Sequence, residues 1–360
     1  MEISKICARI AAQTMRLEIA KNAGESVAKG LLHAVPPRTE SWILKRGIEK
    51  ILLTTEYIYP PNFWETIDEY AANGGFVIVQ NHFSNADILA VDLLANKITN
   101  RVNNTAPQDK KMGGFIEPFA DSLPEDGQGE MSKFYKMVKP LINKLRVETN
   151  PIPTLNDLLN GRIHSYEKYK ADLEKAQERM DMATSEERKG VILPAEATVQ
   201  GGRINPETEE IYGMQLFTPN SVKMALSSVT QTNEYGIVIP VAVSGGADVL
   251  NSETNGITLP ATLVGLGISK QILMRVHVGM PIIYRKSDIE KLDPKTVNYE
   301  VATTIAQMLD PKERGVYGSQ ETYEAALKAY MEKRLQAKEI IRKLRSDEAK
   351  EKSSSTPRQS

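Results

Sequence analysis

Short apolar runs and longer segments with helical spacing alternate along most of the chain. Runs rich in β-branched residues predict strands at 76–80, part of 101–106, 144–148, 191–195, 236–243 and 273–283. Between them, apolar positions recur three or four residues apart, which predicts helices. This alternation predicts an α/β fold with a mixed central sheet flanked by helices on both faces, an αβα sandwich.

The same patterns divide the chain into segments of different character. We expect a small N-terminal helical domain, an α/β domain, a charged C-terminal helix and a disordered tail, at residues 1–73, 74–318, 319–352 and 353–360. Within the α/β domain, the polar stretch at about 154–189 predicts a helical insertion in the form of an exposed helical hairpin.

Composition and charge bound the classes of protein that fit. The 360 residues are 41% hydrophobic and 25% charged, as in globular proteins that stay in solution. The net charge of −1 provides no field that attracts nucleic acid, so no nucleic-acid partner is expected. Cys7 is the only cysteine, which excludes an intrachain disulfide.

The length of the apolar stretches indicates where in the cell the protein resides. No window reaches the ~18 apolar residues of a membrane span, and the first residues lack the apolar core of a signal peptide. We therefore expect a cytoplasmic protein, or one in an organelle stroma after processing. It would be soluble or bound peripherally to a membrane.

The most informative chemistry follows the strand predicted at Phe76–Val79. That strand leads into Asn81-His82, and Asp87 opens the next amphipathic segment, so it lies on the first turn of a helix. The chain can fold back so that the carboxylate meets one imidazole nitrogen, which leaves the other nitrogen as a general base. A structural alternative stays open: Asp87 can serve the helix dipole behind a Ser84 cap, with His82 an ordinary partly buried histidine.

A second group of polar residues follows the strand predicted at 191–195. It comprises a carboxylate, a hydroxyl, two glycines and an arginine, at Glu196, Thr198, Gly201, Gly202 and Arg203. The glycines let backbone approach a ligand closely, and the guanidinium offers a planar fork suited to phosphate. The alternative is a turn that carries a solvated arginine.

The order of these motifs resembles the glycerolipid acyltransferase superfamily. That family has Asn-His with Asp five residues after the His, then a strand ending in a Pro/Glu motif with Thr, then a Val-Ile-Pro-Val-Ala strand. The corresponding residues here are Asn81-His82 with Asp87, Pro194 to Thr198, and Val238 to Ala242. Met274 to Ile282 also looks like the family's terminal strand and Gly-x-Pro turn.

A closer likeness is to the soluble plastid-type glycerol-3-phosphate acyltransferases, which also carry a helical N-terminal domain. It rests on Gly201 to Pro206, Thr208-Glu209, Phe217 and Ser221 to Met224, and it covers about residues 40 to 285. Three features differ from that branch. Asn205 replaces a second arginine, Ala197 replaces the usual glycine, and a Lys-Lys-His cluster expected near 148–152 is not present.

The resemblance implies an O-acyltransferase that moves a fatty acyl group to the sn-1 hydroxyl of glycerol-3-phosphate. The donor would be a thioester, either acyl-CoA or acyl-carrier protein, and no cofactor or metal is expected. His82 would be the general base and Asp87 would orient it. The implied substrate-binding residues are Glu196, Thr198, Gly201, Gly202, Arg203 and Asn205.

Other interpretations remain. A lysophosphatidate acyltransferase is the nearest alternative within the class. Outside it are a lipid-binding protein without turnover and a metal-dependent hydrolase that uses His82, Asp87 and Glu196 as ligands. For Lys110-Lys111, a solvated turn is favoured. The alternative is a site that attracts the phosphates of coenzyme A or an acidic carrier protein.

Overall fold

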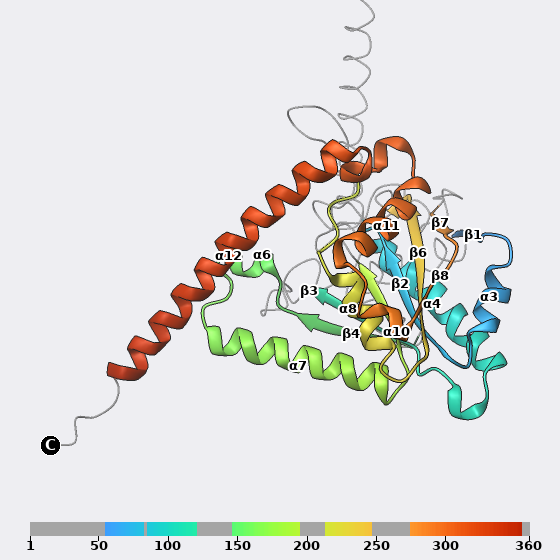
Figure 1. The fold of residues 1–360 in the computed structure, drawn as a ribbon, viewed down its shortest axis with the longest axis horizontal. Helices are drawn as coiled ribbons and strands as arrows, with labels where there is room; N and C mark the ends of the chain where they lie inside the picture. Colours follow the sequence, from blue (N-terminus) through green and yellow to red (C-terminus); the bar gives the residue numbers. More distant parts are fainter. Residues whose placement is uncertain (1–54, 83–84, 121–145, 195–212, 247–273, 355–360) are drawn as a thin grey trace, which may run out of the picture.

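In the part of the chain that the structure describes, the centre of the fold is an eight-stranded mixed sheet (Figure 1). The computed structural model describes residues 55–82, 85–120, 146–194, 213–246 and 274–354. The strands are β1 Glu56–Ile58, β2 Gly74–Gln80, β3 Phe115–Ala120, β4 Val147–Ile152, β5 Gly190–Pro194, β6 Tyr235–Ser244, β7 Arg275–Val278 and β8 Ile282–Arg285. Their order is β1-β7-β6-β2-β5-β3-β4, and β8 pairs with β6.

Most neighbours in this sheet are parallel. Among the described strands, β7 and β8 alone run antiparallel to β6, each along a different part of that strand. The sheet is therefore mixed, and the predicted α/β class with a helix-flanked mixed sheet is confirmed.

Strand β2 lies in the middle, between β5 and β6. All seven of its residues are buried, because helices cover both faces of the sheet at this point. Phe76 and Ile78 contribute to the core on one face, and Val77 and Val79 to the core on the other. A β-branched run without an exposed face is what a central parallel strand requires.

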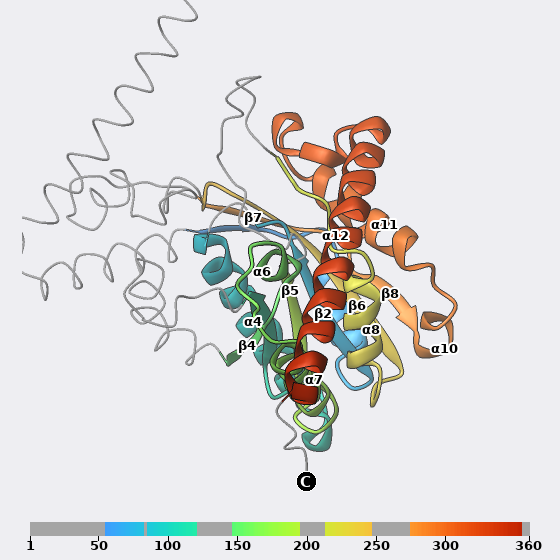
Figure 2. The ribbon, with the colours of Figure 1, turned by 90° about the vertical axis from the view of Figure 1, so that its left-hand side faces the viewer.

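Helices form a layer on each side of the sheet. The described helices are α3 Phe63–Glu69, α4 Asn85–Thr105, α6 Leu155–Leu159, α7 Tyr166–Ser185, α8 Ser221–Val229, α10 Lys286–Ile289, α11 Pro294–Gln307 and α12 Gln320–Ser354, with short 3₁₀ turns η1 Gln108–Lys110, η3 Pro311–Glu313 and η4 Gly315–Tyr317, and α12 packs on α6 and α7 instead of on the sheet. In Figure 2, α4 lies on one side of β2 and β6, and α8 and α11 lie on the other. Of the helices in the described ranges, none combines the length and apolar character needed to cross a bilayer.

The N-terminal boundary of the α/β domain lies earlier than expected. The described part of the predicted helical domain, residues 55–73, packs into the α/β core. There β1 pairs with β7, and Phe63 and Ile67 of α3 join the core beneath α4. Residues 1–54 lie outside the described ranges.

Two further strand predictions need correction. The strand expected in part of 101–106 is the last part of α4, where Val102 packs into the core on a helical face. The strand expected at 273–283 is divided into β7 and β8 around Gly279-Met280-Pro281, where the Gly279 amide donates to the Pro240 carbonyl at 2.8 Å. Strand β3 was not predicted, because Glu117 and Pro118 interrupt its apolar run.

Residues 154–189 form the connection from β4 to β5 and not an exposed hairpin. Since β3 separates these two strands and all three run parallel, the connection must cross over a face of the sheet. Helix α7 makes this crossing, with Ala176 and Ala183 buried. Ser165 caps its first turn by accepting a hydrogen bond from the Lys168 amide at 3.1 Å.

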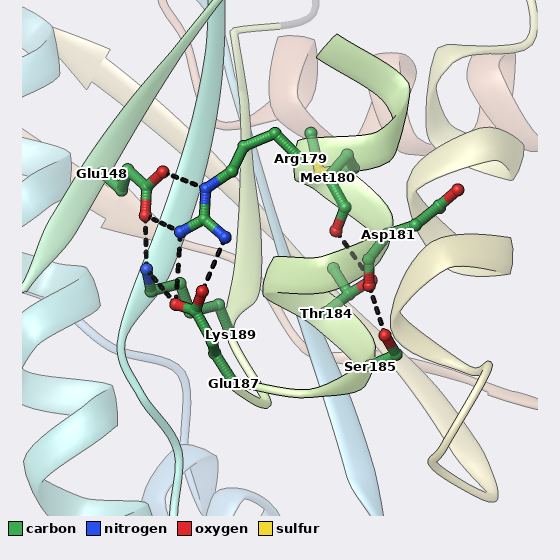
Figure 3. A network of polar contacts seen from close by, with 8 residues as sticks. All are labelled: Glu148, Arg179, Met180, Asp181, Thr184, Ser185, Glu187 and Lys189. Carbon is green, nitrogen blue, oxygen red and sulfur yellow. Dashed lines mark hydrogen bonds and ion pairs between the residues drawn. The ribbon is translucent and has the colours of Figure 1, made fainter. Parts of the chain in front are cut away.

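A network of four charged side chains holds α7 to the sheet (Figure 3). Arg179 makes a bidentate contact with Glu148 of β4, and its Nη1 lies 2.6 Å from Glu187. Lys189 lies 2.5 Å from Glu148 and 2.6 Å from Glu187, which closes a ring of alternating charge. The Arg179 hydrogen bonds lower the pKa of Glu187 to about 2. A ring of this kind stabilises more than isolated surface pairs do.

We expect Arg179→Gln to lower the free energy of unfolding by about 1–2 kcal/mol, since it leaves Glu148 and Glu187 with only Lys189 between them. Urea unfolding at low and high salt measures this loss, which should shrink as salt rises. Arg342→Gln is the control, because Arg342 forms an isolated, exposed pair with Glu339 on α12. Equal effects of the two substitutions would show that the ring adds nothing.

Candidate active site

His82 lies just past the carboxyl end of the central strand. Strand β2 ends at Gln80, and α4 begins at Asn85 and runs back over the sheet. Ligands of parallel α/β sheets bind at this edge, where carboxyl ends of neighbouring strands meet helix N-termini. The exposed fraction of His82 is 7%, so the residue is largely buried at this edge of the sheet.

Asn81 fixes the position from which His82 leaves the strand. Its side-chain amide donates to the Val243 carbonyl at 2.9 Å and accepts from the Val243 amide at 2.7 Å. Gln80 is the last residue of β2 paired with β6, so these two bonds extend the attachment by one residue. Asn81 is fully buried, and its contacts join residues 162 positions apart. Asn81 belongs to the sequence motif, but the motif alone gave it no role.

Burial sets the protonation state of His82. It lowers the pKa of the imidazole to about 4, because the charged form would lose its hydration. The ring is therefore neutral at pH 7. Among the described residues, no group is within hydrogen-bond distance of its Nδ1. One ring nitrogen thus lacks the partner that would fix the tautomer.

Asp87 is fully buried on the first turn of α4. There its carboxylate lies where the helix dipole favours negative charge. The structure therefore brings His82 and Asp87 to the same end of the sheet, on either side of the turn from β2 to α4. A hydrogen bond between them is not observed at Nδ1. Ser84, the expected cap, lies outside the described ranges, so the orienting and capping roles of Asp87 both stay predictions.

The predicted binding residues Glu196, Thr198, Gly201, Gly202, Arg203 and Asn205 lie outside the described ranges. The end of the strand that precedes them in the chain is described. Strand β5 ends at Pro194, whose partner across the sheet is Gln80. The chain therefore leaves β5 beside the strand end that carries His82.

Two buried carboxyl groups that sequence patterns did not single out lie on the α4 side of the sheet. Asp92 of α4 is fully buried, and Glu117 of β3 is 2% exposed. Burial raises the pKa of Glu117 to about 8. Burial and the nearby charge of Glu117 raise the pKa of Asp92 well above its usual range. The pair therefore holds at least one proton at neutral pH.

Several buried polar atoms of β2, β3 and α4, and one of His82, are unpaired. Among the described residues, both Asp92 oxygens, Oε1 of Glu117 and both side-chain polar atoms of Gln80 lack a hydrogen-bond partner, as does Nδ1 of His82. Buried polar groups are nearly always hydrogen-bonded, and exceptions are commonest where a site binds a ligand or performs chemistry. A charged residue inside an apolar run, as at Glu117 and Asp92, is the sequence signal that could have found them.

The remaining candidates lie elsewhere. Lys110 and Lys111 precede β3, at the amino end of the parallel strands and thus at the edge opposite His82. His164 is exposed, and His277 lies half-buried in β7. Within the described residues, no group of three or more His, Cys, Asp or Glu side chains could hold a metal ion.

No protein-family model matches this chain, and no curated protein matches it.

The carboxyl pair makes stability depend on pH. Between about pH 4.5 and pH 8, an unfolded chain has released the Glu117 proton that the folded chain keeps, so the free energy of unfolding falls as pH rises. Glu117→Gln removes this proton difference. We expect the melting temperature of the variant to fall less steeply than that of the native chain over this range.

Thermal unfolding at several pH values measures both slopes, with Glu178→Gln at an exposed position of α7 as the control. Parallel curves for the native chain and Glu117→Gln would show that Glu117 ionises as an ordinary surface carboxylate does.

Proposed function

We propose that this protein is an O-acyltransferase that moves a fatty acyl group from a thioester donor to the sn-1 hydroxyl of glycerol-3-phosphate. The observation that carries the proposal is the buried, neutral His82 at the carboxyl end of the central strand, with the buried Asp87 on the first turn of the helix that follows. The proposal includes an αβα sandwich of the acyltransferase type and the small N-terminal helical domain predicted at residues 1–73, of which residues 55–73 pack into the α/β core.

The reaction needs one base and one site for developing negative charge. The neutral imidazole of His82 takes the proton of the acceptor hydroxyl as its oxygen attacks the thioester carbonyl. A C–O bond forms, the C–S bond breaks, and the proton passes from His82 to the departing thiolate. The N-terminal turn of α4 stabilises the negative charge that develops on the carbonyl oxygen. No covalent enzyme intermediate is required.

Asn81 and Asp87 act on His82 in this scheme. The two hydrogen bonds of Asn81 to Val243 hold the backbone from which His82 projects. Asp87 stabilises the imidazolium that forms during transfer and orients the ring once substrate is bound. Burial lowers the pKa of His82, and a negative charge held beside the ring would raise that pKa and make the imidazole a stronger base in the complex.

The acceptor phosphate is assigned to Arg203, supported by Gly201, Gly202 and Asn205. This assignment rests on the residue pattern and on the position of Pro194 beside Gln80. Glu196 and Thr198 follow Pro194 most closely in the sequence and are assigned to the acceptor hydroxyls. The fork of an arginine suits a phosphate dianion better than a point charge does.

His82→Ala should lower kcat by ~10²–10⁴, the usual contribution of a general base, while the fold persists. Steady-state kinetics with thermal unfolding measures both properties. His164→Ala is the matched control, because this histidine is exposed. Native turnover in His82→Ala would contradict the mechanism. Lost turnover with substrate binding intact in the same variant would exclude a lipid-binding protein without catalysis.

Asp87→Asn separates the orienting role from the structural one in the same experiment. We expect lost turnover with little change in melting temperature, since the amide keeps the size of the side chain. A large stability loss with native kcat would instead identify Asp87 as a residue of the helix terminus.

Arg203→Ala should raise the KM for glycerol-3-phosphate by ~10–150-fold, because a charge-assisted contact contributes ~1.5–3 kcal/mol. The donor KM should barely change. Arg203→Lys should recover only part of the loss, since an ammonium group cannot reproduce the bidentate contact. If both variants keep the native acceptor KM, or if glycerol is acylated as well as glycerol-3-phosphate, Arg203 does not bind the phosphate.

A further inference from the structure

The C-terminal helix α12 has one face fixed to the rest of the protein. Ala337 of this helix is buried. Near its end, Glu348 accepts hydrogen bonds from the Ser165 hydroxyl and the Tyr166 amide, both at 2.8 Å, at the N-terminus of α7. Arg345 lies over the Tyr166 ring at 4.9 Å. These contacts set which face of the 35-residue helix points outward.

The outward face combines exposed apolar side chains with basic ones. Met331 is 43% exposed and Leu335 is 59% exposed. Lys338 and Arg342 lie seven and eleven residues after Met331, so all four side chains share one face of the helix. In Figure 2, α12 is the element nearest the viewer, and no other labelled element covers it.

Positive charge is concentrated on this part of the chain. From Lys328 to Arg345 there are seven basic and two acidic residues, an excess of five positive charges on a chain whose net charge is −1. Within the described residues, Arg342 forms an ion pair with Glu339 at 3.0 Å, but Lys338 and Lys343 have no acidic group within ion-pair distance. Pairing inside the protein therefore does not account for the excess.

We propose that the outward face of α12 is a docking surface for an anionic lipid membrane. Met331 and Leu335 would enter the headgroup region, while Lys338 and Arg342 contact lipid phosphates. The 18 residues from Lys328 to Arg345 span ~27 Å, which lets one helix contact many lipids along its length. A basic helix with apolar residues on one face and low overall hydrophobicity is typical of helices that lie in the bilayer interface.

A protein partner is less favoured by this geometry. The face is a single convex helix with two apolar side chains, whereas stable protein interfaces bury ~1,200–2,000 Å² of closely matched surface. A bilayer needs no such match, because lipids adapt to the helix. The proposal depends on the surface of α12 alone and not on acyl transfer.

Vesicle co-sedimentation of the full chain tests the proposal. We expect binding to vesicles of phosphatidylcholine mixed with phosphatidylglycerol, little binding to phosphatidylcholine alone, and weaker binding as salt rises. Each basic residue at an anionic surface contributes about fivefold in affinity, so Lys338→Gln combined with Arg342→Gln should weaken binding by ~30-fold. Leu335→Ser should weaken binding even at high salt, where the charge contribution is screened.

The control combines Lys175→Gln with Lys291→Gln, which removes the same charge from exposed positions on other elements. Circular dichroism checks that α12 persists in each variant. Equal binding to neutral and anionic vesicles would overturn the proposal, as would equal losses in the α12 and control variants. Binding of an acidic carrier protein without vesicle binding would assign this face to a protein partner and would also overturn it.

Discussion

The position of the candidate site depends on the confinement of strand β2. Neighbouring strands hydrogen-bond it on both edges, helices bury it on both faces, and it cannot shift without disrupting two cores at once. Asn81 extends this constraint one residue further, through paired hydrogen bonds to Val243. The backbone that carries His82 is therefore held more firmly than a loop would be. Catalytic geometry requires this kind of support, since small displacements cost large factors in rate.

The same burial governs the electrostatics of the region. Loss of hydration keeps His82 neutral and holds a proton on the pair formed by Asp92 and Glu117. A protein selected only for stability would replace this pair with apolar side chains of similar size. Asp92 lies on α4 five residues after Asp87, and Glu117 of β3 lies near enough to affect its charge, so burial of this pair needs a reason other than stability. The ring of charges around Arg179 shows the opposite arrangement, where every charge has a partner and the role is to hold α7 in place.

Local sequence patterns predicted the strands that are apolar throughout and the helix that is charged along most of its length. The apolar runs of β2, β5 and β6 and the charged helix α12 were all recognisable, and so was the position of His82 after a strand and Asp87 on a first helical turn. Strand β3 was missed because Glu117 and Pro118 break its pattern, although burial of Glu117 is possible in the folded protein as a protonated acid. The contact between Asn81 and Val243 joins distant parts of the chain, so no local pattern could indicate it. The assignment of Arg203 and its neighbours rests on the residue pattern and on the position of Pro194 beside Gln80.

The most direct test of the account is an acyl-transfer assay of the purified full chain with several acceptors. Glycerol-3-phosphate, lysophosphatidate and glycerol would each be offered with acyl-coenzyme A and with acyl-carrier protein as donor. We expect acylation of glycerol-3-phosphate at the sn-1 hydroxyl with at least one donor, at a rate well above that with glycerol. Preferred acylation of lysophosphatidate would correct the acceptor while keeping the role of His82. A folded protein that acylates none of these alcohols with either donor would contradict the assignment of His82 as the base of an acyl transfer.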